Sequence, residues 1–149
     1  MAAFHQIVCP KCGTVNRVPI ERPADAARCG SCHQGLFDAH PVAVDEPRFE
    51  RHVRSNSIPV LLDVWAPWCG PCRAMAPAFE RASTALEPHV RLLKLNADEA
   101  PNVSARLGVR GIPAMYLFQE GAIVAKTTGA MPAEAIVRWT RDHLAKRSF

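Results

Sequence analysis

The sequence predicts an α/β protein in which a central mixed sheet is flanked by helices and preceded by a small N-terminal module. Apolar runs alternate with helical segments and end in a strand–turn–strand unit and a closing helix, an order typical of helices that cover both sheet faces. The first 38 residues differ, because they hold four of the six cysteines. At 149 residues and 48% hydrophobic content, the chain can form one well-buried domain plus an appendage. We therefore expect two modules, 1–38 and 39–149.

The elements of the second module follow from local signals. Asp45 predicts a helix N-cap, with Pro47 in the first turn. Pro77 predicts a kink in the long central helix. Asp98 or Asn102 is expected to cap a short helix that ends near residue 108. The expected strands are 40–44, 59–65, 90–95, 114–118 and 122–127, and the expected helices are 46–54, 72–86, about 98–107 and 132–146; residues 15–20 predict one further strand in the first module.

Two cysteines lie where the apolar run 60–65 gives way to the helix after it. Cys69 is expected in the turn that enters the helix, and Cys72 in its first turn. Unpaired N–H groups and the helix dipole stabilise a thiolate there, and the thiolate is the nucleophilic form of cysteine. Pro71 suits an early helical position, and Gly70 allows close approach of a partner's backbone. We predict attack by Cys69 and resolution by Cys72; half of a structural zinc site is the alternative.

The other four cysteines form a C-x2-C-x16-C-x2-C pattern. Cys9, Cys12, Cys29 and Cys32 have the spacing of a structural zinc site, which uses four tetrahedral ligands. Gly13 and Gly30 are expected to help the two turns. So small a segment needs a metal to compensate for its small core, so we predict a zinc-ribbon-like module with one structural Zn²⁺. Two disulfides are the alternative, and Cys29 to His33 also fits the C-x-x-C-H haem-attachment pattern.

Composition argues against several classes of function. No apolar run approaches the length of a membrane helix, and the first residues do not resemble a secretory signal. Net charge is +4, with scattered basic residues, so neither nucleic acid nor a membrane is an expected partner. Six cysteines without a signal favour the cytoplasm, where cysteines are catalytic or bind metal. A dinucleotide fingerprint is missing, so no organic cofactor is expected.

The segment from Trp65 to Cys72, Trp-Ala-Pro-Trp-Cys-Gly-Pro-Cys, resembles the active site of the thioredoxin family. The likeness covers roughly residues 39–149 and implies the thioredoxin fold. With the four-cysteine module in front, the whole chain is most similar to the zinc-containing bacterial thioredoxins, the thioredoxin 2 group. The resemblance implies a protein-disulfide reductase that acts on disulfide-containing proteins and is recycled by an NADPH-dependent thioredoxin reductase.

Asp63 is the one charged residue in its apolar strand, so burial should raise its pKa toward neutrality. The resemblance implies that Asp63 lies beneath the cysteines and takes the proton of Cys72. A hydrogen-bonded structural carboxylate is the alternative. Lys94 matches the family's buried lysine near that carboxylate, although a solvent-exposed strand lysine fits the sequence as well.

The resemblance also implies a surface that binds substrate. Pro113 matches a cis-proline beside the cysteine pair, whose preceding backbone pairs with an extended substrate. Gly129 matches a glycine that the substrate backbone passes closely. The apolar surface around Cys69 would comprise Trp65, Ala66, Pro67, Trp68, Ile112 and Ala130, with Pro67 and Trp68 as the main substrate contacts and Trp65 partly in the core.

A second interpretation is a redox-regulated zinc-binding adaptor, in which the N-terminal module binds a partner or senses oxidation. The set of Cys69, Cys72, Asp63 and Pro113 favours the enzyme, because an adaptor has no need of it. An oxidase or isomerase of an oxidising compartment is a third interpretation. The Gly70-Pro71 pair and the missing export signal argue against it.

Overall fold

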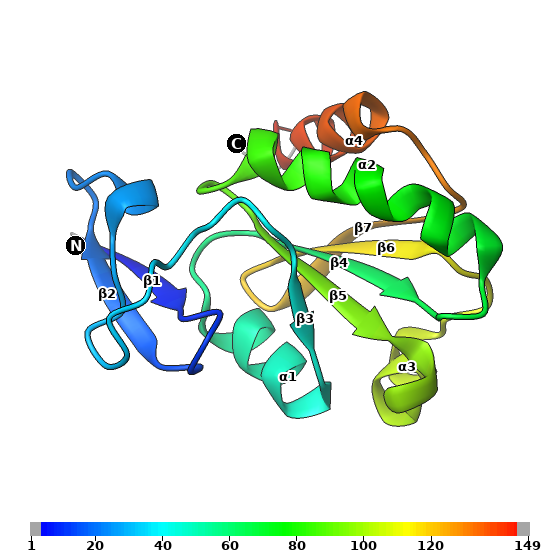
Figure 1. Ribbon diagram of the computed structural model, residues 1–149, viewed down its shortest axis with the longest axis horizontal. Coiled ribbons are helices and arrows are strands. Elements are labelled where there is room, and N and C mark those ends of the chain that lie inside the picture. The colour runs from blue at the N-terminus through cyan, green and yellow to red at the C-terminus, as the bar shows by residue number, and fades with distance from the viewer. Residues whose placement is uncertain (1–3, 146–149) are drawn as a thin grey trace.

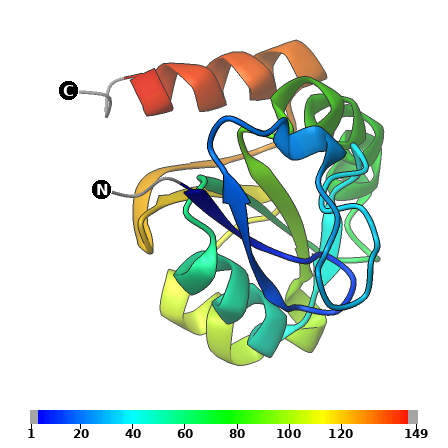
Figure 2. The same cartoon turned by 90° about the vertical axis from the view of Figure 1, so that its left-hand side faces the viewer.

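A computed structural model describes residues 4–145 of the chain, and it has two parts (Figure 1). We call residues 4–38 the head and residues 39–145 the main domain. The head lies beside one end of the central sheet, at the left in Figure 1, and it is closest to the viewer in Figure 2. The order of elements in the main domain is the one that the sequence predicts, with boundaries shifted by one or two residues at most positions.

The main domain is built on a five-stranded sheet in the order β3-β5-β4-β6-β7. The first three of these strands are parallel, and β6 and β7 continue the sheet in antiparallel pairing. The mixed sheet that the sequence predicts is thus confirmed. The strands are β3 (Val42–Val44), β4 (Val60–Trp65), β5 (Arg91–Asn96), β6 (Ala114–Gln119) and β7 (Ala122–Thr128).

Helices cover both faces of this sheet (Figure 1). On one face, α2 and α4 pack through Phe79 and Ile136 against Leu61 and Leu92. On the other face, α1 and α3 pack through Phe49 and other apolar side chains against the alternate residues of the same strands. The helices are α1 (Glu46–Ser55), α2 (Gly70–Leu86), α3 (Pro101–Leu107) and α4 (Ala133–Ala145).

Local sequence signals account for several boundaries. The Asp45 carboxylate accepts the Arg48 N–H at 2.9 Å and caps α1, as predicted. The turn between β6 and β7 has positive φ at both Glu120 and Gly121, the geometry of a tight hairpin. The predicted closing helix is described through Ala145, and its last predicted residue, Lys146, lies outside the described residues. Between residues 4 and 145, no helix is both long and apolar enough to cross a bilayer.

The predicted cap of the short helix is wrong. Neither Asp98 nor Asn102 caps α3; instead Asn96 accepts the Asp98 N–H and starts a separate 3₁₀ turn, η2 (Ala97–Glu99). One unpaired backbone N–H at the start of α3 is satisfied from another helix, because the Glu46 carboxylate of α1 accepts the Val103 N–H at 2.8 Å. This cap is 57 residues away in sequence, so no local pattern could have revealed it.

The head is a two-stranded antiparallel ribbon and a second, irregular loop. The predicted strand at 15–20 appears as β2 (Val15–Pro19), and it pairs with β1 (Phe4–Val8), which the sequence analysis did not predict. A short 3₁₀ turn, η1 (Ala24–Ala26), connects the ribbon to the second cysteine pair. The buried side chains of Ile7, Val18 and Leu36 form a small core that also includes Ile58 of the main domain.

A buried arginine joins the head to the main domain. Arg91 begins β5, is fully buried, and donates from Nη2 to the carbonyls of Val8 and Leu36 at 3.1 and 2.8 Å. Its guanidinium lies over the Phe37 ring at 4.5 Å, and Glu87 lies 3.8 Å away as its counter-charge. The head is therefore docked through a charge that the main domain supplies.

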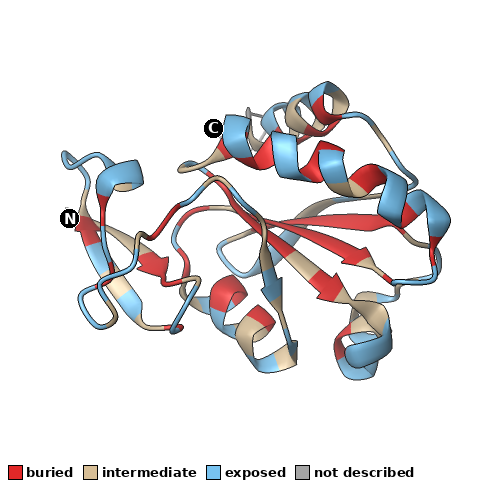
Figure 3. Cartoon of the chain, in the orientation of Figure 1, coloured by how far each residue is buried: buried red, intermediate tan, exposed pale blue. Residues whose placement is uncertain are grey.

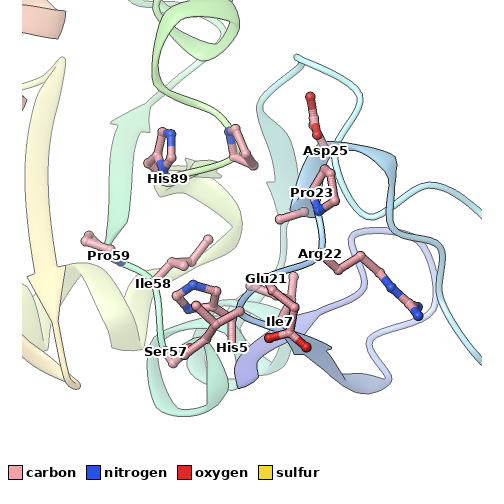
Figure 4. A pocket seen from close by; sticks show the side chains of 13 residues that line it. His5, Ile7, Glu21, Arg22, Pro23, Asp25, Ser57, Ile58, Pro59 and His89 are labelled. Carbon is pink, nitrogen blue, oxygen red and sulfur yellow. The ribbon is translucent and has the colours of Figure 1, made fainter. Parts of the chain in front are cut away.

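The same boundary encloses a cleft of about 560 Å³ (Figure 4). His5 and Glu21 from the head and Pro59 and His89 from the main domain are among the residues that line it. Pro59 immediately precedes β4, whereas Cys69 follows the other end of that strand. The cleft thus lies at the end of the sheet away from the cysteine pair.

Candidate functional site

Cys69 and Cys72 form a disulfide at the start of α2, with Cα atoms 5.3 Å apart. Cys69 is the N-cap residue of the helix, and its Sγ accepts the backbone N–H of Cys72 at 3.2 Å. Gly70 and Pro71 occupy the first two helical positions, where the missing N–H of proline costs nothing. The cysteines therefore have the helix-start geometry that the sequence predicts, and Cys69 is slightly more exposed, at 5% against 2% for Cys72.

A loop from the far side of the sheet lies against Cys69. The Ile112–Pro113 peptide bond is cis, as the family resemblance implies, and the Ile112 carbonyl oxygen is 3.8 Å from Cys69 Sγ. The Pro113 carbonyl in turn accepts the Gly129 N–H at 2.9 Å. The structure thus gathers the predicted residues Ile112, Pro113 and Gly129 beside the disulfide.

The rim of the site is partly apolar and exposed. Trp68 is 69% exposed, and its indole Nε1 donates to the Asp98 carboxylate at 3.0 Å, which fixes the ring on the surface. Arg73 donates to the Pro67 carbonyl and ties the preceding loop to α2. Pro67, Gly129 and Ala130 are exposed, Ile112 and Trp65 are half-buried, and Ala66 is buried.

Asp63 lies on the sheet face that α2 covers. Side chains alternate along a strand, and its neighbours Leu62 and Val64 pack on the opposite face under α1 and α3. The surrounding strands are almost wholly buried (Figure 3), and Asp63 itself is 1% exposed with no hydrogen-bond partner for Oδ1 among the described residues. Burial raises the pKa of Asp63 to about 7, opposed by the positive charge of Lys94. The predicted shift toward neutrality is confirmed.

Lys94 is the direct neighbour of Asp63 in the pairing of β4 with β5. Leu92 on the same strand packs under α2, and by alternation Lys94 shares that face. Its side chain is half-buried, with Nζ 4.9 Å from the centre of the Trp65 ring. The sequence left open a buried lysine near Asp63 or a solvent-exposed one. The observed position is intermediate, because Lys94 neighbours Asp63 but keeps access to water.

The second site is the cluster of four cysteines in the head. All four Sγ atoms lie within 4.8 Å of one another, and the two closest pairs, Cys9–Cys32 and Cys12–Cys29, are both 3.6 Å apart. Each close pair joins one C-x-x-C turn to the other. The four predicted metal ligands therefore lie together in one cluster. A haem attached through the C-x-x-C-H pattern would use only Cys29 and Cys32, and this pattern would not account for the position of Cys9 and Cys12 beside them.

The two cysteine turns have the same backbone pattern. Gly13 and His33 each follow the second cysteine of a pair, each has positive φ, and each donates its N–H to the carbonyl of the first cysteine. The expectation that Gly30 relaxes the second turn is wrong, because the left-handed residue there is His33. Gly30 instead donates its N–H to the Asn16 side chain.

The donor set fits zinc. Tetrahedral coordination with Zn–S bonds of about 2.3 Å places sulfur atoms about 3.8 Å apart, close to the shorter separations found here. Backbone N–H groups also point at sulfur: Lys11 donates to Cys9 and Ser31 donates to Cys29, at 3.4 and 3.3 Å. Such bonds stabilise negative charge on the ligand atoms. Zn²⁺ held by these thiolates would supply folding energy without redox chemistry.

Sequence reasoning missed Arg91 and Asp98. Arg91 begins a strand with three buried leucines, but that strand also holds Lys94 and Asn96, so a buried charge was harder to recognise there than at Asp63. Asp98 carries no comparable signal, because its contact with Trp68 joins two loops that are 30 residues apart.

Comparison with known proteins agrees with this geometry. The family described as Thioredoxin matches residues 40–142, and the family described as Thioredoxin 2, N-terminal, matches residues 8–34. Thioredoxin C-3 of Corynebacterium nephridii is 37% identical over 141 residues, which cover 95% of this chain and 97% of that protein. Thioredoxin of Rhodospirillum rubrum is 42% identical over 96 residues, 64% of this chain and 92% of its own length.

Solved structures show the same fold. Chloroplastic thioredoxin z has a TM-score of 0.65 and 25% identity, with 71% of this chain and 96% of that chain covered. A mutant thioredoxin of Halobacterium salinarum has a TM-score of 0.64 and 26% identity, covering 72% and 93%. The chain therefore belongs to the thioredoxin family, and it is a protein-disulfide reductase that acts by dithiol–disulfide exchange.

Proposed function

We propose that Cys69 is the nucleophile of this exchange and that Cys72 is the resolving thiol. The observation that carries the assignment is the N-cap position of Cys69, where Sγ accepts the Cys72 N–H at 3.2 Å. That bond and the helix dipole both favour a thiolate at Cys69. Cys72 lies inside the first turn and is less exposed, so an incoming disulfide meets Cys69 first.

Dithiol–disulfide exchange proceeds in two steps, and each step breaks one S–S bond for the one that it forms. The Cys69 thiolate attacks one sulfur of the substrate disulfide, so a Cys69–substrate bond forms, the substrate S–S bond breaks and one substrate thiolate leaves. Cys72 then attacks Cys69 Sγ, and the second substrate thiolate leaves. The substrate gains two electrons, and the enzyme ends as the Cys69–Cys72 disulfide, which is the form described here.

Asp63 serves as the proton acceptor of the second step. Its burial beneath α2 and its pKa of about 7 support this role, because such a carboxylate exchanges a proton near neutral pH. Cys72 must lose its proton to attack, and Asp63 lies on the sheet face that is covered by α2, the helix that carries Cys72. Lys94 supports Asp63 by favouring the charged form.

The substrate lies along the rim of the site. Pro67 and Trp68 supply exposed apolar surface on one side of Cys69, and Ile112, Gly129 and Ala130 supply the other. The Ile112 carbonyl, 3.8 Å from Cys69 Sγ, is positioned to accept a backbone N–H of an extended substrate beside Pro113.

The protein works in the cytoplasm with an NADPH-dependent thioredoxin reductase that returns Cys69 and Cys72 to dithiols. Four cysteines at metal-ligand spacing favour a reducing compartment, where thiols stay available for metal. The flavin and NADPH belong to that reductase, and the chain itself needs no organic cofactor. Residues 1–38 form a zinc-ribbon-like module around one structural Zn²⁺, and residues 39–149 form the catalytic domain.

A coupled assay tests the function. The full chain, NADPH and a thioredoxin reductase are mixed with insulin, and NADPH oxidation is followed by absorbance. We expect turnover that requires both Cys69 and Cys72. An adaptor would give no turnover, and an oxidase or isomerase would show a reduction potential well above that of a reductase in a glutathione titration.

A further inference from the structure

α2 and α4 run side by side on one face of the sheet (Figure 1). One hollow lies between these two helices, and a second lies between α2 and residues 130–132, which lead into α4. The hollow nearer the disulfide has a volume of about 330 Å³. All the side chains that line it are apolar except that of Arg81; they are Ala74, Met75, Pro77, Ala78, Ala130, Met131 and Pro132.

This hollow borders the rim of the catalytic site, because Ala130 belongs to both. One wall is α2 itself, starting at Ala74, two residues after Cys72. The other wall is the segment that follows Gly129, whose N–H bonds to the Pro113 carbonyl beside Cys69. A polypeptide whose cysteine reaches Cys69 therefore lies within a few residues of the hollow.

Arg81 stands where the two hollows meet, because it lines both. Arg81 is exposed, and its side chain makes no ion pair or hydrogen bond with any residue between 4 and 145. The second hollow adds Arg138 and Arg141 together with Glu134 and Asp142. Opposite charges balance in part there, but no acidic residue lines the hollow beside the disulfide.

We propose that this hollow is a substrate subsite that selects an apolar side chain followed by an acidic one, and that Arg81 determines the preference for acid. This rests on the proposed function, because it extends the surface that receives the substrate. The apolar walls remove the first side chain from water, and the unpaired guanidinium attracts the second. The occupant is a segment of the disulfide-bearing protein next to the cysteine that Cys69 attacks.

The test compares two peptides with the same internal disulfide. One carries Leu-Glu-Glu on both sides of the disulfide, and the other carries Leu-Lys-Lys. Full-length wild type is expected to favour the acidic peptide in kcat/KM by about threefold, the effect of an exposed ion pair. Arg81→Glu should reverse the preference, because attraction becomes repulsion. Raising the ionic strength from about 0.01 M to about 1 M should shrink the preference in wild type.

Arg54→Glu is the matched control, because Arg54 is also an exposed helical arginine but lies on α1, across the sheet. Each variant is judged by its own acidic-to-basic ratio, so a change in overall activity cancels. The subsite is supported if Arg81→Glu inverts the ratio and Arg54→Glu does not. It is overturned if wild type shows no preference, or if both variants change the ratio equally.

A second variant tests the apolar half. Met131→Ser should lower the advantage of Leu over Gly in otherwise identical acidic peptides, and an unchanged advantage would overturn an apolar subsite.

Reduction of uncharged 2-hydroxyethyl disulfide by wild type distinguishes failure of the proposed function from failure of the subsite. If wild type reduces neither peptide nor this compound, the proposed function fails; if it reduces both peptides equally well, only the subsite fails.

Discussion

Asp63 and Lys94 are direct neighbours on the parallel strands β4 and β5, on the sheet face that is covered by α2, the helix that begins at the disulfide. Asp63 is buried and Lys94 is half-buried, so the carboxylate loses most of its hydration while its counter-charge keeps some. The desolvation outweighs the attraction, and the pKa of Asp63 rises to about 7. The pair therefore provides a proton acceptor that titrates near neutral pH.

The first prediction concerns the order of the two thiols. Cys72→Ser should accumulate covalent adducts with protein substrates, because Cys69 still attacks but no thiol resolves the product. Lysate incubated with this variant would show the adducts on non-reducing gels. Cys69→Ser is the matched control; if that variant accumulates the adducts instead, the two roles are reversed.

The second prediction concerns proton transfer. In wild type, resolution of the mixed disulfide should accelerate as pH rises through about 7, because only ionised Asp63 accepts the Cys72 proton. Asp63→Asn should lose this inflection and slow resolution at neutral pH by on the order of 100-fold. Stopped-flow kinetics across pH measures both. Asp25→Asn, at an exposed site in the head, should keep the wild-type profile. An inflection that survives in Asp63→Asn would make Asp63 purely structural.

The third prediction concerns stability in the oxidised form. The pKa of Asp63 is raised from 3.8 to about 7, so between these values the folded state holds a proton that the unfolded state has lost. The contribution of Asp63 to stability therefore falls as pH rises through this window. Relative to wild type, Asp63→Asn should gain on the order of 3 kcal/mol of unfolding free energy between pH about 4 and about 8. Urea denaturation at both pH values measures the difference, and a constant difference would contradict the prediction.

The fourth prediction concerns the metal. Freshly reduced protein should contain one equivalent of zinc by elemental analysis, and Cys12→Ser or Cys29→Ser should lose it. Strong chelation should unfold the head, because its core is small, and leave substantial reductase activity. A truncation that starts near residue 37 should also keep activity. Less than about half an equivalent of zinc, or an inactive truncation with a native circular-dichroism spectrum, would refute the two-module account.

The fifth prediction concerns the docking of the head. Arg91→Met removes the donors that serve the Val8 and Leu36 carbonyls and leaves the Glu87 carboxylate without its cation. Because these groups are buried, the full chain should lose on the order of 3 kcal/mol of unfolding free energy. Arg54→Met, at an exposed position, should change it by less than about 0.5 kcal/mol. Equal losses in the two variants would show that Arg91 does not join the two parts.

The sequence by itself determined the features that depend on neighbours along the chain. The Asp45 cap, the position of Cys69 and Cys72 at the start of a helix, and the burial of Asp63 in an apolar strand all follow from patterns a few residues long. The spacing of the four head cysteines also belongs here, because each C-x-x-C turn is local. The family resemblance added Pro113 and Gly129, which no local pattern identifies.

Only the tertiary structure decided the contacts between segments far apart in sequence. Glu46 caps α3 from 57 residues away, Arg91 reaches Leu36 across 55 residues, and Trp68 meets Asp98 across 30. The hollow at Arg81 likewise exists because packing brings the segment after Gly129 alongside α2. A charged side chain has the same local propensity whether it ends in water or in the core. Its partner is selected by the free energy of desolvation in the assembled fold, and that quantity has no local signature.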